Sequence, residues 1–105
     1  MSFVADRMSL LLWLQRGLLG EVHPQLRQAS IEADPSSCVV RVRFEYDGEP
    51  TEAVRGSCSC AATEVIAAFP SSWQLDDQHI SARLPAQLRP LQYVGYARAE
   101  ARSET

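Results

Sequence analysis

Carboxylates form the densest group of chemically useful side chains in this sequence, because Glu45, Asp47, Glu49 and Glu52 fall within one short stretch. Two such groups can act as general acid and general base. The stretch also has the composition of a turn, and the Asp47-Gly48-Glu49-Pro50 run leads into a helical pattern whose dipole stabilises acids at its start. We therefore predict a solvated acidic turn that attracts a basic partner.

A second acidic pair, Asp76-Asp77, interrupts a later apolar pattern, and we place it in another turn. The pair would enlarge the acidic surface if the two turns meet in the fold, an arrangement that the sequence leaves open. The predicted partner-binding residues are Glu45, Asp47, Glu49, Glu52, Asp76 and Asp77.

The cysteine and histidine residues give weaker indications of a metal site or a catalytic site than the carboxylates do. Cys58 and Cys60 are two residues apart on a predicted helix, so their side chains point about 200° apart and cannot share a metal ion. Cys58 belongs to an apolar stripe and is expected in the core. A pair of Cys60 with His79, oriented by Asp77, stays open as an alternative, although no local signature of a nucleophile accompanies it. We predict no catalytic residue, no metal and no cofactor.

The 105 residues suit one domain, with 46% hydrophobic and 22% charged side chains. All basic residues are arginine, which removes the phosphate-binding lysine motifs, and the net charge of −3 disfavours a nucleic-acid partner. The odd count of three cysteines indicates a reducing compartment. The apolar run Leu10–Leu14 is too short to span a membrane. Asp6 precedes it, Arg16 follows it and no small-residue cleavage site comes next, so we do not expect a signal peptide. We expect a cytoplasmic protein with no membrane partner.

Periodicity predicts a first helix over Val4–Leu19, ended by Gly20. The residues predicted to form its core face are Val4, Met8, Leu11, Leu12, Gln15, Leu18, Leu19 and Val22. Leu10, Trp13 and Leu14 extend the apolar surface around the helix, so they are candidates for a homodimer contact.

Alternating residues at 28–33 and 38–46 predict a β-hairpin, with a turn at 34–37. A second helix should begin near Pro50 or Thr51 and end before Pro70, with Gly56 weakening its first turns. Trp73 to Leu84 fits either a bulged strand or a short hairpin. Residues 85–90 form a linker, residues 93–98 form the last strand, and 99–105 form a mobile tail.

These elements give an α+β fold of order α-β-β-α-β-β in two layers, with an antiparallel or mixed sheet and both helices on one face. The single domain spans residues 1–98. The opposite sheet face should expose its charged side chains to water and to a docking partner. Those side chains are Glu32, Arg41, Arg43 and Glu45.

Four segments carry a family resemblance, namely Leu19–Arg27, Phe44–Glu52, Thr63–Pro70 and Val94–Arg98. With these segments the chain resembles small immunity proteins of bacterial contact-dependent inhibition and related polymorphic toxin systems, over about Leu10 to Arg98. Gly56, Cys58 and Cys60 depart from the pattern, because charged or aliphatic residues are ordinary there. The resemblance implies an inhibitor that binds a toxic domain, often a nuclease, and blocks its active site.

Two other functions remain open on the residues alone. A small adaptor or homodimeric structural domain would use the face of Leu10, Trp13 and Leu14. An enzyme would use the Glu45–Glu52 carboxylates or His79 in a pocket, and raised pKa values there would distinguish it.

Overall fold

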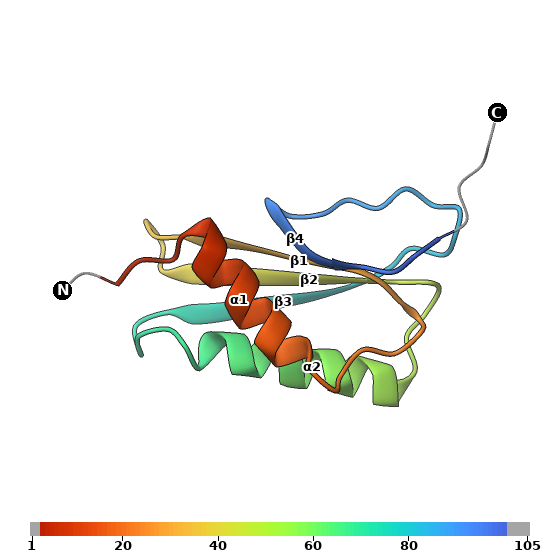
Figure 1. Ribbon diagram of the computed structural model, residues 1–105, viewed down its shortest axis with the longest axis horizontal. Coiled ribbons are helices and arrows are strands. Elements are labelled where there is room, and N and C mark those ends of the chain that lie inside the picture. Colours follow the sequence, from red (N-terminus) through yellow and green to blue (C-terminus); the bar gives the residue numbers. More distant parts are fainter. Residues whose placement is uncertain (1–2, 101–105) are drawn as a thin grey trace.

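Two helices cover one face of a four-stranded sheet in the computed structural model, which describes residues 3–100 (Figure 1). The elements are α1 (Arg7–Leu18), β1 (Leu26–Asp34), β2 (Val39–Tyr46), α2 (Glu52–Ile66), β3 (Gln74–Ser81) and β4 (Tyr93–Ala97). The predicted α+β class and the order α-β-β-α-β-β are confirmed. No helix within residues 3–100 combines the length and the apolar character that crossing a bilayer needs.

The sheet has the order β3-β2-β1-β4 and is mixed. β1 pairs antiparallel with β2 and with β4, whereas β2 and β3 are parallel. Parallel neighbours require a crossover connection, and α2 supplies it. The predicted hairpin is confirmed, with Ile31 opposite Val42 and Ala29 opposite Phe44.

The core lies between the central hairpin and the helices. Alternate side chains of β1 and β2 point into it, as their sequence pattern predicts. On the second helix the predicted apolar stripe is buried from Val54 to Phe69, and Thr51 caps the first turn by accepting from the backbone N–H of Val54. Gly20 follows α1 with a φ of 77°, the left-handed conformation expected of a helix stop.

The first helix packs on a different face from the one predicted. Its buried residues are Leu10, Leu14, Gly17 and Leu18, whereas Met8 is 81% exposed. Gly17 explains why α1 buries this face, because a Cβ there would lie 2.5 Å from the carbonyl oxygen of Ala61. The missing side chain lets α1 approach α2 closely on that face alone. Leu10 and Leu14 are therefore core residues, and a homodimer contact through them is wrong.

Trp13, the third residue of that predicted contact, is half-buried in an aromatic cluster. Its ring lies 5.8 Å from Phe3 and 5.0 Å from Phe69, measured between centroids, and Trp73 completes the group. Aromatic pairs at such separations stabilise a fold beyond their buried area. Trp13 thus joins the start of the chain to the end of α2.

The weak pattern after α2 forms neither a bulged strand nor a hairpin. β3 runs without interruption beside β2, and Asp76 and Asp77 lie within it, opposite Arg41 and Val42. The expectation of a turn at these aspartates is wrong. β3 is an edge strand, so its alternation carries polar side chains that a central strand would exclude.

The outer sheet face is partly covered. The connection from β3 to β4 must pass from one sheet edge to the other, and the helices occupy the inner face. On the outer face, the backbone N–H groups of Arg89 and Leu91 donate to Glu45 and to the Ser30 hydroxyl, over 2.7 and 2.9 Å. Glu45 is only 1% exposed, so the prediction that it faces water is wrong. Glu32 and Arg41 stay partly exposed and pair with each other.

Substituting Gly17 tests the close helix crossing. Gly17→Ala should lower the free energy of unfolding by about 1–3 kcal/mol, because the added methyl group overpacks the contact with Ala61. Gly56→Ala is the matched control on α2, where a Cβ meets nothing within 4 Å, and it should raise stability by up to about 1 kcal/mol. Urea denaturation of both variants measures the difference, and equal gains in stability would contradict the crossing.

Candidate functional site

The acidic turn after β2 has a fixed shape. Gln25, the residue before β1, donates its side-chain N–H groups to the carbonyl oxygens of Glu49 and Asp47, over 2.6 and 3.2 Å. Gly48 has a φ of 86°, a conformation that favours glycine. Glu49 and Glu52 are exposed at this turn. These two of the predicted partner-binding carboxylates are thus presented to solvent on a rigid support.

Asp47, in the same turn, is engaged within the protein. Its Oδ2 accepts from Arg98 over 2.8 Å, and its Oδ1 accepts from the backbone N–H of Leu84 over 2.9 Å. The guanidinium group of Arg98 lowers the pKa of Asp47, and the Leu84 N–H adds to the effect. Most of its negative charge is therefore compensated, and Asp47 contributes less to an acidic surface than the sequence predicts.

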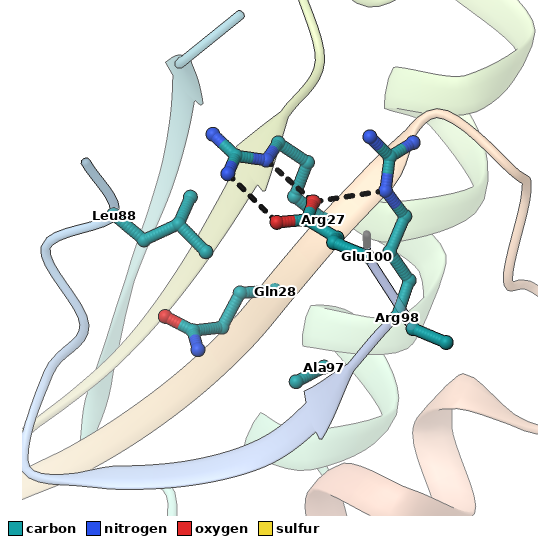
Figure 2. Close-up of a pocket in the computed structure, with 7 residues that line it drawn as sticks. Arg27, Gln28, Leu88, Ala97, Arg98 and Glu100 are labelled. Carbon is teal, nitrogen blue, oxygen red and sulfur yellow. Dashed lines mark hydrogen bonds and ion pairs between the residues drawn. The ribbon is translucent and has the colours of Figure 1, made fainter. Parts of the chain in front are cut away.

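Glu100 lies between Arg27 and Arg98 and binds both (Figure 2). Arg27 donates from Nε and Nη2 to the two carboxylate oxygens, over 2.7 and 2.8 Å, and Arg98 donates from Nε over 3.0 Å. Arg27 also donates to the carbonyl oxygens of Ala82 and Ala86. We call Arg27, Asp47, Arg98 and Glu100 the clamp. They join the residues after β4 to β1, to the acidic turn and to the β3–β4 connection that covers the outer sheet face.

The clamp borders a hollow of about 530 Å³ next to Gln28 and Leu88. The arginines that face this hollow are engaged within the protein. Arg27 donates to Glu100 and to two carbonyl oxygens, and Arg98 donates to Glu100, to Asp47 and to a carbonyl oxygen. Glu100 falls in the segment predicted to be a tail, and residues 101–105 of that segment lie outside the described residues. Sequence reasoning missed the clamp because its members are up to 73 residues apart.

Asp76 and Asp77 do not join the acidic turn. Asp76 pairs in the sheet with Arg41, five positions before Tyr46, which places it about 16 Å along the strand from the turn. Its carboxylate forms an ion pair with Arg41 over 3.4 Å on the outer face. Asp77 alternates to the helix side, where it contacts His79. The two acids therefore face opposite sides of the sheet and form no common surface.

His79 lies in a buried polar cluster on the inner side of β3. Its Nδ1 is 2.7 Å from the Tyr46 hydroxyl, while its Nε2 faces both Asp77, at 3.0 Å, and the Ser59 hydroxyl, at 3.4 Å. A catalytic triad needs the carboxylate on one ring nitrogen and the nucleophile on the other. Here both contact the same nitrogen. Burial raises the pKa of Tyr46, so its hydroxyl keeps its proton.

The alternative pair of Cys60 with His79 is not formed. Cys60 is exposed and lines a groove with Arg16 and Glu64 beside α1, whereas His79 contacts the neighbouring residue Ser59 on the β3 side of α2. Cys58 is buried in the core, as predicted, and burial raises the pKa of its thiol. Within residues 3–100, no group of three or more His, Cys, Asp or Glu side chains is placed to hold a metal ion.

The ion pairs of Glu100 predict a pH dependence of stability. Its hydrogen bonds from Arg27, followed by those from Arg98, lower its pKa from 4.5 to about 2. A lowered carboxylate pKa contributes stability above the unfolded value, which is lost as the pH falls through the folded value. Glu100→Gln should therefore lower the urea midpoint at pH 7, and the difference from the unmodified protein should shrink between pH 4.5 and pH 2.

Glu64→Gln is the control for this prediction, since Glu64 is exposed and forms no ion pair among the described residues. Its urea midpoint should follow the unmodified protein at every pH. A constant difference for Glu100→Gln across the acid range would contradict the role of its charge.

The comparisons with known proteins bear on the whole of this structure. The model of the MafI2 immunity protein family matches residues 7–100, from the first residue of α1 to the glutamate of the clamp. No curated protein matches the chain. The match covers all six elements and confirms the resemblance to immunity proteins of polymorphic toxin systems. The chain belongs to the MafI2 immunity protein family.

Proposed function

We propose that this protein binds the toxin domain of its own system and keeps it inactive by covering the active site or substrate channel. The family match over residues 7–100 carries the proposal, because an immunity protein protects the cell that makes it by engaging a toxin. Neutralisation by binding needs a stable surface and no turnover. A single core, a capped second helix and the clamp provide such a stable support.

We further propose that the toxin domain is basic, as a nuclease would be, and that the acidic turn accelerates its capture. The net charge of −3 favours such a partner, and Glu49 and Glu52 remain exposed on a turn held by Gln25. Complementary charge increases the rate of association more than it strengthens the final complex. Glu45 is left out of this surface because its side chain is buried.

The proposed mode of action is non-catalytic and cytoplasmic. Ser59 and the carboxylate of Asp77 contact the same ring nitrogen of His79, which argues against a catalytic triad with Ser59 as the nucleophile. The carboxylates of the acidic turn are either exposed to solvent or paired within the clamp. Cys38, Cys58 and Cys60 are free thiols, which suits a reducing compartment. An adaptor role is the alternative, and it would leave a cognate toxin fully active.

Co-expression tests the proposal directly. A candidate toxin domain of the same system is expressed in a sensitive host, with and without the immunity protein, and growth and co-purification are measured. We expect growth to be restored and the two chains to co-purify. A toxin that stays lethal and unbound in the presence of the folded protein would refute the proposed function.

Charge reversal tests the acidic turn. Glu49→Lys should slow association with the toxin domain by about threefold or more at low salt, with little change in dissociation, because steering acts on the encounter. Glu32→Lys makes the same charge change at a partly exposed site on the outer sheet face, away from the acidic turn, and should have a smaller effect. Stopped-flow kinetics measures both rates. Equal rates for the two variants would remove the turn from the binding surface.

A further inference from the structure

The solvent face of α1 carries a row of exposed apolar side chains. Met8, Leu12 and Leu19 are 81%, 46% and 78% exposed, and Val4 and Val22 extend the row at its two ends. From Met8 to Val22 the row advances by alternating steps of four and three residues, with Gln15 as its polar member. Met8 and Leu12 lie on one face of α1, where a spacing of four residues keeps side chains together. Leu19 caps the end of α1, and Val22 lies in the connection after it, beside Leu19 in one groove. We call Val4, Met8, Leu12, Leu19 and Val22 the α1 seam.

A contiguous exposed row is unusual in a small soluble protein, where exposed apolar residues are normally scattered and contiguous patches mark binding sites. The seam is not needed for the core, because the opposite face of α1 supplies Leu10, Leu14 and Leu18 to it. The helix is therefore apolar on two sides, and only one of them is used within this chain.

A groove adjoins the seam where α1 ends. It has a volume of about 510 Å³ and is bordered by Leu18, Leu19 and Val22 on one side and by Gly95 and Tyr96 of β4 on the other. Gly95 lets α1 pack closely on β4, because a Cβ there would lie 2.6 Å from Cδ2 of Leu14. β4 is an edge strand, so the groove lies beside the free side of the sheet. A protruding apolar side chain of a partner fits such a recess.

The seam also meets the acidic turn. The segment that follows Leu19 contacts α2 through a hydrogen bond between His23 and Ser57, and it contacts the turn through one from Gln25 to the Glu49 carbonyl oxygen. Figure 1 shows this segment beside the first turn of α2. The last residue of the seam, Val22, is three positions before Gln25, which holds the acidic turn. This arrangement suits a partner with an apolar centre and a basic rim.

We infer that the α1 seam and its groove are the surface on which the toxin domain docks, with the acidic turn at the rim. The inference rests on the proposed function and adds the location of the interface. A second copy of this chain fits the seam less well. Two copies of charge −3 repel each other, whereas a basic toxin domain is attracted to a chain of this charge.

The test introduces one charge into the seam and the same charge elsewhere. Met8→Glu and Leu19→Glu place a carboxylate at the two most exposed seam positions, and Ile80→Glu is the matched control, since Ile80 is 41% exposed on the outer side of β3. The dissociation constant with the purified toxin domain is measured by titration calorimetry, together with growth rescue, urea midpoints and sedimentation of each variant alone. We expect each seam variant to weaken binding at least about 30-fold and to lose rescue, with its midpoint unchanged. Ile80→Glu should bind normally.

The other outcomes separate the two proposals. Normal toxin binding by both seam variants would overturn the inference while leaving the proposed function intact. A dimer of the unmodified protein that both seam variants dissociate, with toxin binding retained, would assign the seam to a second copy and also overturn it. An unmodified protein that binds no toxin would refute the proposed function itself, and that failure is visible before any variant is made.

Discussion

The contact between Gly17 of α1 and the backbone of Ala61 in α2 decides how the molecule presents itself to a partner. A Cβ at Gly17 would lie 2.5 Å from the Ala61 carbonyl oxygen, so only a glycine permits this approach. The approach selects the Leu10 and Leu14 face for the core and leaves the α1 seam in solvent. A local requirement for a missing side chain thus determines which surface is available for binding.

A second set of contacts fixes the ends of the elements near that surface. Gln25 holds the acidic turn, and the clamp joins Asp47 to the residues after β4 through Arg98 and Glu100. Arg27 is 4% exposed and satisfies its donors with Glu100 and two carbonyl oxygens, as a buried charge must. These contacts stiffen the acidic turn before any partner arrives, and preorganisation of this kind lowers the entropic cost of binding.

Much of the fold follows from local patterns in the sequence. The β1–β2 hairpin, the apolar stripe of α2 and the left-handed Gly20 are each encoded by neighbouring residues, and each is confirmed. The face of α1 was mispredicted because the helix is apolar on two sides, and periodicity alone cannot choose between them. Gly17 marks the buried face, but a glycine inside a helix is not a sufficient signal, because Gly56 in α2 has nothing within 4 Å of its Cβ position.

The candidate site was less predictable because it depends on long-range contacts. Glu45 has the alternation of a solvent-facing residue, and only the path of the β3–β4 connection buries it. Asp76 and Asp77 have the composition of a turn, yet strand pairing with β2 places them within the sheet. Glu49 and Glu52 are exposed as the sequence predicts, whereas the clamp has no sequence signal because its members are distant.

We propose that the protein binds its toxin domain through the α1 seam. Methyl NMR spectroscopy of the unmodified chain tests this binding surface most directly. Addition of the toxin domain should shift the methyl signals of Met8, Leu12 and Leu19 and protect them from a soluble relaxation agent, while those of Ile80 and Leu84 stay exposed and unchanged. Protection of Ile80 and Leu84 with an unaffected seam would contradict the account.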